Sequence, residues 1–204
     1  LLKELFESNF NIKKCWLAEQ IDSNNGLEYD LISPTALSKV SHLQNPHFGL
    51  AIVEIPNETS ANNDQIQLVL DGISDPGNLG TIIRLADWYG IKSINCVNNC
   101  VDAFNPNVVQ ATMGSIFRVN IVVNELENLE MQPPVYGAVM DGKSIYNLEK
   151  TEKCTLLIGS EANGISNEVL KLCSEKITIP KKGRAESLNA GVATGIILDR
   201  LTQV

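Results

Sequence analysis

Hydrophobic residues in the last two thirds of the chain fall into short, nearly continuous runs, and stretches with helical spacing separate them. The runs 66–70 and 154–158 are apolar at almost every position and too short for core helices. Such runs indicate strands buried on both faces, so residues 66–204 are predicted to form an α/β domain with a parallel sheet. The predicted strands are 66–70, 93–97, 118–123, 135–139, 154–158 and 176–179, and the predicted helices are 78–89, 105–112, 166–173 and 187–203.

The first quarter of the chain has a pattern of its own and ends in a polar stretch. Residues 57–65 contain no large apolar side chain and are predicted to be a linker between a domain of residues 1–56 and the α/β domain of residues 66–204. The chain opens without an initiator Met and inside a helical pattern, so we expect residues 1–56 to be a partial, small α/β domain. Its predicted elements are a helix end at 1–8, strands at 12–17 and 48–55, and a helix at 34–41 that Ser33 and Pro34 begin.

The composition is that of an ordinary globular protein with a negative charge. The 204 residues include 24 acidic and 16 basic side chains, which gives a formal charge of −8. No apolar run reaches the roughly 18 residues of a membrane span and no signal-peptide pattern opens the chain, so we expect a cytoplasmic protein with no membrane partner. The negative net charge argues against a protein that binds nucleic acid through its overall charge. Nucleic acid could then be bound only through a local basic patch.

The cysteines do not form a metal-binding pattern. There are five, and only Cys96 and Cys100 lie close together in the chain, with no second pair or nearby His. We interpret the cysteines as reduced core thiols and expect no metal site. The two histidines, His42 and His47, lie far from the motifs described below and are not expected to be catalytic.

The first loop that carries candidate functional residues follows the predicted strand 66–70. Its Asp75-Pro76-Gly77 sequence is typical of a turn, and Asn78 suits the N-cap of the following helix, which carries Arg84 in its second turn. The loop is neither a Walker A motif nor the Gly-x-Gly-x-x-Gly of dinucleotide-binding folds. Taken alone, it is equally compatible with a plain turn and a solvated arginine.

The second loop, residues 159–166, follows the predicted strand 154–158. Gly159 and Gly164 flank Glu161, and glycines at a strand end permit positive φ and close approach of the backbone to a ligand. The loop lacks the Gly-x-Ser-x-Gly of hydrolases. An ordinary glycine-rich turn with an exposed glutamate is the alternative interpretation.

The third loop follows the predicted strand 176–179 and contains the local basic patch of Lys181, Lys182 and Arg184. Ser187 and Asn189 then open a predicted helix with small residues at most positions of its first two turns, so we expect another element to pack closely against it. Ser187 and Asn189 are also candidate helix caps.

Together, these motifs closely resemble those of the SpoU/TrmH family of RNA ribose 2′-O-methyltransferases, in the SPOUT class. The matching segments lie in residues 66–204 and read DPGNLGTIIRLAD, ATMGSIFR, IGSEANGIS and IPKKGRAESLNAGVATGI. The resemblance implies a parallel-sheet α/β fold with a C-terminal trefoil knot, a rare exception to the rule against threaded chains. It also implies a homodimer formed through the knot domain. Residues 1–56 resemble part of the ribosomal-protein-like domain that many members use to bind substrate RNA.

The resemblance implies that the knot loops bind S-adenosylmethionine, largely through backbone groups. The residues expected to line that pocket are Gly159, Ile179, Leu188, Val139 and Gly164, and the segment from Val139 to Gly142 is expected to border it. No metal is needed for the reaction, which transfers a methyl group from a sulfonium to a ribose 2′-hydroxyl of structured RNA, either rRNA or tRNA.

The resemblance places Arg84, Glu161 and Asn189 in the catalytic site, with Asn78 and Ser187 in support. Arginine seldom gives up its proton in proteins, so we expect Arg84 to hold a target phosphate or the developing alkoxide, while an RNA phosphate or water accepts the proton. The residues expected to contact RNA are Arg84, Arg118, Lys181, Lys182 and Arg184.

Three alternatives remain at this point. A SPOUT enzyme that methylates a base is disfavoured by the intact set of Arg84, Glu161 and Asn189. A catalytically silent RNA-binding or ribosome-assembly protein with the same fold would not need Glu161 or the Gly159 loop, so the presence of both disfavours this alternative. A nicotinamide-dependent enzyme would need the glycine fingerprint that this chain lacks.

Overall fold

The computed structural model describes residues 1–21, 27–41, 43, 45–46, 48–56, 66–149 and 151–202. The predicted linker 57–65 and both histidines lie outside the described residues. The chain divides into two compact units, residues 1–57 and 58–204, which are described separately.

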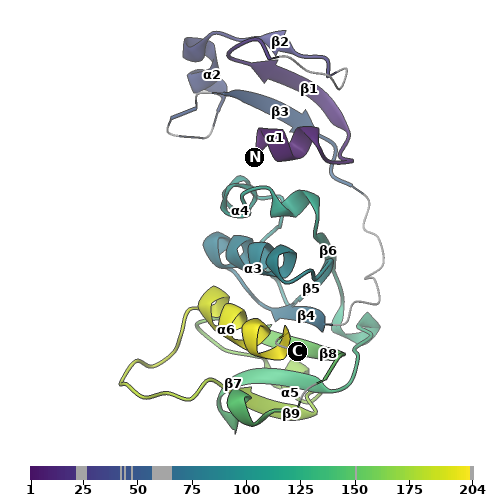
Figure 1. The fold of residues 1–204 in the computed structure, drawn as a ribbon, viewed down its shortest axis with the longest axis vertical. Helices are drawn as coiled ribbons and strands as arrows, with labels where there is room; N and C mark the ends of the chain where they lie inside the picture. Colours follow the sequence, from purple (N-terminus) through teal and green to yellow (C-terminus); the bar gives the residue numbers. More distant parts are fainter. Residues whose placement is uncertain are drawn as a thin grey trace. The chain divides into compact units, whose positions relative to one another are not determined.

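The N-terminal unit is a small three-stranded sheet with two short helices (Figure 1). Strand β1 lies in the middle, parallel to β2 and antiparallel to β3. Ser33 caps α2 by accepting a hydrogen bond from Ala36 N–H, as the Ser-Pro pair predicts. Strand β2 was not predicted, because two residues are too few to produce a pattern. The elements are α1 (Leu2–Phe6), β1 (Ile12–Leu17), β2 (Asp30–Leu31), α2 (Pro34–Val40) and β3 (Gly49–Val53).

The C-terminal unit confirms the predicted α/β domain with a parallel sheet. Its six strands lie in the order β6-β5-β4-β8-β7-β9, and every neighbouring pair is parallel. The strands are β4 (Ile66–Asp71), β5 (Ser93–Val97), β6 (Asn120–Val123), β7 (Val135–Ser144), β8 (Cys154–Gly159) and β9 (Glu175–Thr178). The helices are α3 (Pro76–Trp88), α4 (Pro106–Ala111), α5 (Asn167–Leu170) and α6 (Ala190–Thr202), with 3-10 turns η1 (Ser115–Phe117), η2 (Leu126–Asn128) and η3 (Ile145–Asn147).

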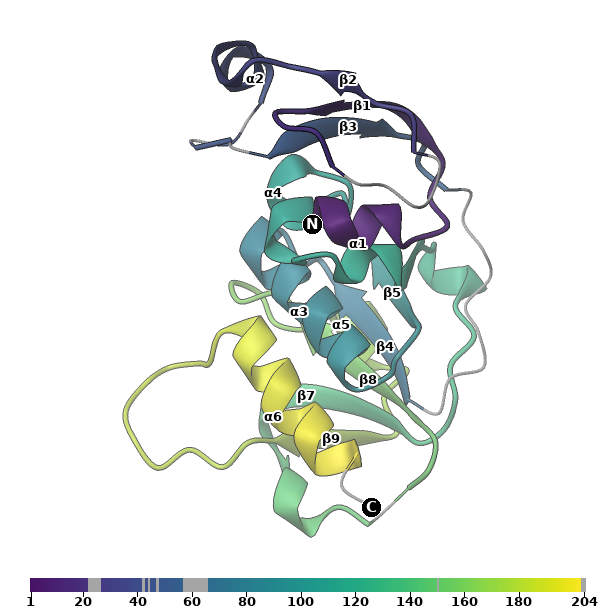
Figure 2. The ribbon, with the colours of Figure 1, turned by 45° about the horizontal axis from the view of Figure 1, so that its top comes forward.

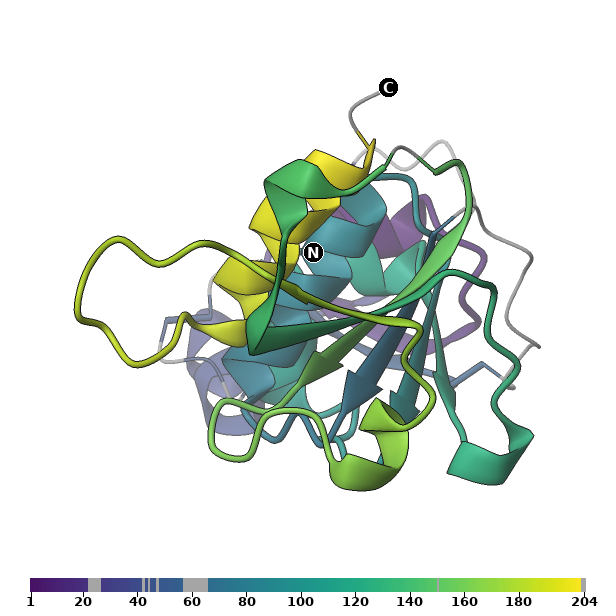
Figure 3. The same cartoon turned by 90° about the horizontal axis from the view of Figure 1, so that it is seen from below.

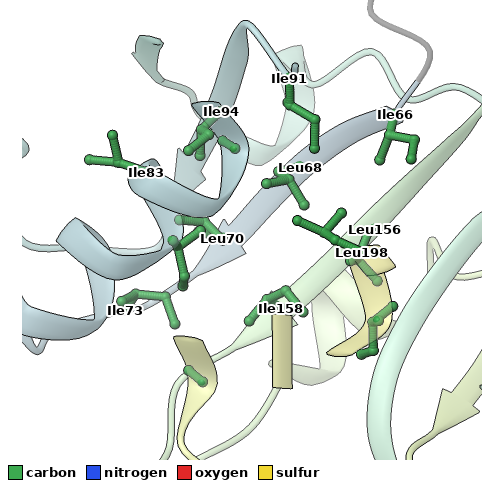
Figure 4. Packing of buried hydrophobic residues seen from close by; sticks show 14 of the residues in the cluster. Ile66, Leu68, Leu70, Ile73, Ile83, Ile91, Ile94, Leu156, Ile158 and Leu198 are labelled. Atoms are coloured by element: carbon green, nitrogen blue, oxygen red, sulfur yellow. The ribbon is translucent and has the colours of Figure 1, made fainter. Parts of the chain in front are cut away.

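Both faces of this sheet are covered, as the continuous apolar strands predict. Leu68 and Leu70 of β4 pack into the core on the side of α3 and α6, together with residues of β8 (Figure 4). The intervening Val69 belongs to a second core with Val169 of α5. Helix α3 packs against both α4 and α6 (Figure 2), and α5 covers the opposite face (Figure 3).

Two predicted helix starts are corrected by the structure. Helix α3 begins at Pro76, and its N-cap is Asp75, whose side chain accepts a 2.8 Å hydrogen bond from Asn78 N–H. The prediction that Asn78 is the cap is therefore wrong, because proline favours the first helical position and leaves the cap to the residue before it. Helix α6 begins at Ala190 rather than 187, and Asn189 caps it by accepting a 3.1 Å bond from Val192 N–H.

Strand β7 is about twice as long as predicted and contains an irregularity. Ala138 and Lys143 both lie opposite Ile177 of β9, so the four residues between them bulge out of the ladder. Gly142 lies in the bulge, where the backbone of Lys176 passes close by. A Cβ at this position would approach the Lys176 backbone to 2.7 Å, so a larger residue would displace one of the two strands. Val139 and Met140 lie in the bulge and line the cavity described below.

The strand order changes direction between β4 and β8. The chain runs outward from β4 through β5 to β6, while β7, β8 and β9 lie on the other side. In open parallel sheets, ligands bind beyond the carboxyl ends of the strands at such a switch point. The loops that leave β4, β8 and β9 carry the three sequence motifs.

Candidate active site

Three loops converge on one carboxylate beyond the ends of β4 and β8. Glu161 Oε1 accepts hydrogen bonds from Asn78 Nδ2 at 2.6 Å and from Asn189 Nδ2 at 2.9 Å. Asn189 Nδ2 also contacts Asn78 Oδ1 at 2.6 Å. The structure thus brings together three of the predicted site residues, separated by 83 and 28 positions in the chain.

Glu161 lies in a tight hairpin that its glycines make possible. Ser160 and Gly164 exchange two backbone hydrogen bonds, of 3.1 and 2.8 Å, and Gly164 has φ +67°. A Cβ on Gly159 would come within 2.2 Å of Gly164 and Ile165 backbone atoms. No side chain fits there without moving the hairpin, so Gly159 permits the turn that presents Glu161.

The first turn of α6 places a positive dipole beside Glu161. Ala190 N–H, the first of the helix, donates to Glu161 Oε1 at 3.4 Å. Asn189 contributes twice, because its Oδ1 caps the helix while its Nδ2 contacts Glu161. A carboxylate is stabilised at a helix N-terminus, where unpaired N–H groups carry partial positive charge. All the described donors reach Oε1, which leaves Oε2 available to a ligand.

A cavity of about 640 Å³ opens beside this cluster. All five residues predicted to hold the cofactor line it, namely Gly159, Ile179, Leu188, Val139 and Gly164. Its volume falls within the range of cofactor-sized pockets, and its walls are mostly aliphatic with Glu161, Lys181 and Lys182 as charged groups. The aliphatic walls fit a planar ring such as adenine, and the Glu161 carboxylate fits a cationic centre such as a sulfonium. S-adenosylmethionine has both groups.

Met140 lies in the segment from Val139 to Gly142 that was expected to border the pocket, and it lines the cavity. Other residues of the cavity wall were not predicted. Ala193 lies one turn after Asn189 on α6, and the small-residue pattern of that helix was a signal for it. Ile158 and Thr178 lie at the ends of β8 and β9.

The remaining predicted residues lie in different places. Ser187, Lys181 and Lys182 line the cavity, and Arg184 belongs to the same exposed loop. Arg84 is exposed on α3, does not line the cavity and has no hydrogen bond or ion pair with any residue that the structure describes.

Arg118 is held away from the cavity by an ion pair. Its Nη2 lies 2.8 Å from Asp87 Oδ2 at the end of α3, and Ser115 Oγ donates to the same oxygen at 2.8 Å. Burial opposes ionisation of Asp87, but the hydrogen bonds from Arg118 and Ser115 outweigh it and lower the pKa of that carboxyl. Ser115 and Arg118 of the sequence motif Ala111–Arg118 therefore stabilise the packing of η1 on α3 through Asp87.

Neither a metal cluster nor a membrane span is found within the described ranges. No three His, Cys, Asp or Glu residues among those described lie together as metal ligands. None of the helices in this part of the chain is long and apolar enough to cross a bilayer.

Comparison with known proteins identifies close relatives over nearly the whole chain. The sequence pattern of the SpoU rRNA Methylase family matches residues 65–199. The 23S rRNA (guanosine(2553)-2′-O)-methyltransferase of Bacillus subtilis is 29% identical, over 98% of this chain and 85% of its own length. The AdoMet-bound rRNA methyltransferase of Sinorhizobium meliloti has a TM-score of 0.84 and 27% identity, over 98% of this chain and 82% of that one.

Proposed function

The chain belongs to the SpoU rRNA methylase family and is an S-adenosylmethionine-dependent RNA ribose 2′-O-methyltransferase, and we propose that Glu161, Asn78, Asn189 and Arg84 form its catalytic site. The observation that carries this assignment is the convergence of Asn78 and Asn189 on one oxygen of Glu161 at the mouth of the cavity. Ser187, on the cavity wall, supports the same site.

Methyl transfer to a hydroxyl requires an in-line approach of the oxygen and removal of its proton. The cofactor supplies a methyl group on a sulfonium, and Gly159, Val139, Gly164, Ile179 and Leu188 would hold it in the cavity. These residues provide close backbone approach and aliphatic walls.

Glu161 has an orienting and electrostatic role in this scheme. Because three donors fix Oε1, the carboxylate cannot rotate freely, and Oε2 presents a fixed acceptor to a hydroxyl or amine. The negative charge of the Glu161 carboxylate also favours binding of the cationic sulfonium in the cavity. Arg84 holds a target phosphate or the developing alkoxide, because a guanidinium keeps its proton and binds oxyanions in two-point fashion.

The test of the catalytic assignment is Glu161→Gln, which preserves shape but removes the charge. We expect kcat for RNA methylation to fall by about 100-fold, as for loss of a preorganised electrostatic group, with folding unchanged. Glu168→Gln, at an exposed glutamate in α5, is the matched control and should keep normal activity. Normal turnover in Glu161→Gln would disprove the assignment.

Structured RNA, either rRNA or tRNA, is the substrate in this proposal, and the exposed Lys181, Lys182 and Arg184 support it. We assign substrate RNA binding also to the unit of residues 1–57, which is compact in its own right. A cytoplasmic location is supported by the free state of all five cysteines, since disulfides are rare in that compartment.

A homodimer is also part of the proposal. Apolar side chains are exposed on the packed helices α3 and α6, including Trp88, which is 83% exposed, and Val192 and Ile196. Large apolar side chains exposed on neighbouring helices are a feature of protein interfaces when they form one patch. Sedimentation velocity of the intact chain and of Trp88→Asp tests the dimer: we expect dimers for the first and a shift to monomers for the second.

A further inference from the structure

Asp71 is the last residue of β4, and its carboxylate is buried beneath the site. The residue is 3% exposed. Oδ2 accepts a 2.6 Å hydrogen bond from Ser166 N–H, and Oδ1 accepts a 2.8 Å bond from Asn98 Nδ2. A buried carboxylate is costly unless it is hydrogen-bonded, so these short bonds hold the side chain in one position.

Ser166 ends the loop that carries Glu161. The loop leaves β8 at Gly159, which is the register partner of Asp71, and forms the hairpin between Ser160 and Gly164. Ser166 then caps α5. The incoming leg of the hairpin is therefore fixed by the sheet, and the outgoing leg is fixed by the Asp71 carboxylate.

Asn98 completes a ring of contacts around this carboxylate. It follows β5 and has φ +52°, a conformation that asparagine tolerates better than most residues. Its Nδ2 donates both to Asp71 and, at 3.3 Å, to Ser166 Oγ. Asp71, Asn98 and Ser166 thus share one hydrogen-bond network behind the hairpin, in which Asp71 is buried, Ser166 is half-buried and Asn98 is exposed.

We infer that Asp71 is a positioning residue for methyl transfer: with Asn98, it fixes the Ser166 leg of the hairpin and so aims Glu161 at Asn78 and Asn189. This inference rests on the proposed catalytic role of Glu161. Asp71 itself does not line the cavity and would not touch the reacting groups.

The first variant is Asp71→Asn. An amide offers one acceptor oxygen where two donors, Ser166 N–H and Asn98 Nδ2, now approach, so one hydrogen bond is replaced by a donor–donor contact. Displacement of a reacting geometry by about 1 Å can cost 100-fold in rate. We expect kcat to fall by roughly 10- to 100-fold, and the KM for S-adenosylmethionine, whose pocket includes Gly164 of the same hairpin, to rise by a smaller factor.

A double-mutant cycle with Glu161→Gln separates positioning from general stabilisation. If Asp71 acts through Glu161, adding Asp71→Asn to Glu161→Gln lowers kcat by less than about twofold further. If the two losses multiply, the inference is wrong. If Glu161→Gln alone keeps normal activity, the proposed function of Glu161 fails instead, whatever Asp71→Asn does.

A charge-exchange variant provides a rescue. Combining Asp71→Asn with Asn98→Asp moves the carboxylate across the hydrogen bond: the new amide can accept from Ser166 N–H and donate to the new carboxylate, which aspartate at a positive φ permits. We expect kcat to return to within about fivefold of the wild type. Failure to recover any activity would contradict the hydrogen-bond argument.

Thr155→Val is the control for loss of a buried polar network on the same strands. Thr155 on β8 bonds to Gln67 of β4 at the opposite end of the pair, at 2.9 Å, and is fully buried. We expect a lower thermal midpoint but normal kcat. If Asp71→Asn does not fold, Asn98→Gly takes its place in the double-mutant cycle. Glycine accepts the positive φ at position 98, and the variant removes the hydrogen bond from Asn98 Nδ2 to Asp71. A loss of kcat for Thr155→Val as large as that for Asp71→Asn or Asn98→Gly would overturn the inference.

Discussion

At the scale of single residues, Arg84 stands apart from the other proposed catalytic groups. Asn78, Glu161 and Asn189 hold one another in place, whereas Arg84 has no partner among the residues that the structure describes. It lies six residues after Asn78, which is about 9 Å along the helix axis. An exposed arginine without a protein partner is suited to a partner that arrives with the substrate, such as an RNA phosphate.

Arg84→Lys tests this role because it keeps the charge but loses the planar fork. We expect kcat/KM for RNA to fall at least 10-fold, since two-point binding of a phosphate is lost. Binding of S-adenosylmethionine, measured by calorimetry, should stay within about twofold. The thermal midpoint should also be unchanged, because the side chain has no described contact to lose. Full activity in this variant would refute the fork argument.

Cys100 is predicted to be the most reactive thiol of the chain at neutral pH. A hydrogen bond from Cys96, with others from backbone groups including Ile73 N–H, outweighs burial and lowers the pKa of Cys100 to about 7. The same contact and burial raise the pKa of Cys96, and burial raises that of Cys154 to about 11.

Iodoacetamide labelling followed by peptide mass spectrometry measures this difference. The thiolate is the nucleophile, so the rate at Cys100 should rise steeply up to pH 7 and level off above about pH 8. Cys154 should remain unlabelled across that range while the protein is folded. Labelling of Cys173 before Cys100 at pH 7 would contradict the prediction.

The sequence predicted Asn78, Glu161 and Asn189 as residues of one site, and the structure brings them together, but the position of the Asn78 side chain was predicted wrongly. Asp75 and Asn78 are both good capping residues, and the pattern alone does not rank them. Since Asp75 caps α3, the Asn78 side chain is free to reach Glu161. The role inferred for Asp71 was also beyond prediction, because it depends on the contact of a strand end with a residue 95 positions away.

At the scale of elements, the hairpin after β8 is the most constrained part of the site. Gly159→Ala is expected to destabilise the fold by about 1–3 kcal/mol, because the added Cβ would overlap Gly164 backbone atoms. The displaced hairpin should also weaken S-adenosylmethionine binding. Urea unfolding and calorimetric titration measure the two effects.

Gly183→Ala is the matched control for this substitution. Gly183 lies in the loop after β9, where a Cβ would meet nothing within 4 Å and φ is not positive. We expect its free energy of unfolding to change by less than about 0.5 kcal/mol. Equal destabilisation by the two alanines would show that close packing at Gly159 is not the cause.

The strands were predicted well because their apolar runs are continuous, whereas the loops around the cavity were not. The predicted helix 187–203 loses its first turn, since Ser187 and Leu188 belong to the cavity wall instead of continuing α6. The β7 bulge is set by its pairing with β9, so the local sequence does not reveal it. Elements are encoded locally, but the edges of this site depend on contacts between distant strands.

At the scale of the whole molecule, the hydrophobic pattern predicted the parallel sheet, and the family resemblance implied that residues of its three loops form one site. The strand order was not predictable from periodicity, because parallel strands carry similar apolar runs whichever neighbours they have. The trefoil knot stays a prediction from the family resemblance. Threading depends on the path of the chain through space, and hydrophobic pattern carries no information about it.

The distribution of charge leads to a prediction about RNA binding. The chain has a formal charge of −8, and Arg118 is already paired with Asp87. Attraction for RNA should therefore depend on the exposed loop that contains Lys181, Lys182 and Arg184. Binding of RNA should weaken steeply with salt, while binding of S-adenosylmethionine should change by less than about twofold over the same range.

Replacing all three loop cations by alanine should reduce the slope of log K for RNA against log salt by about 2–3, because each phosphate contact contributes roughly 0.7–0.9. Replacing three exposed lysines elsewhere in the same unit, Lys92, Lys153 and Lys171, removes the same charge and should leave the slope nearly unchanged. Filter binding at several salt concentrations distinguishes the two. An equal reduction in both triple variants would mean that RNA responds to total charge, and the basic loop would then lose its proposed role as the RNA contact.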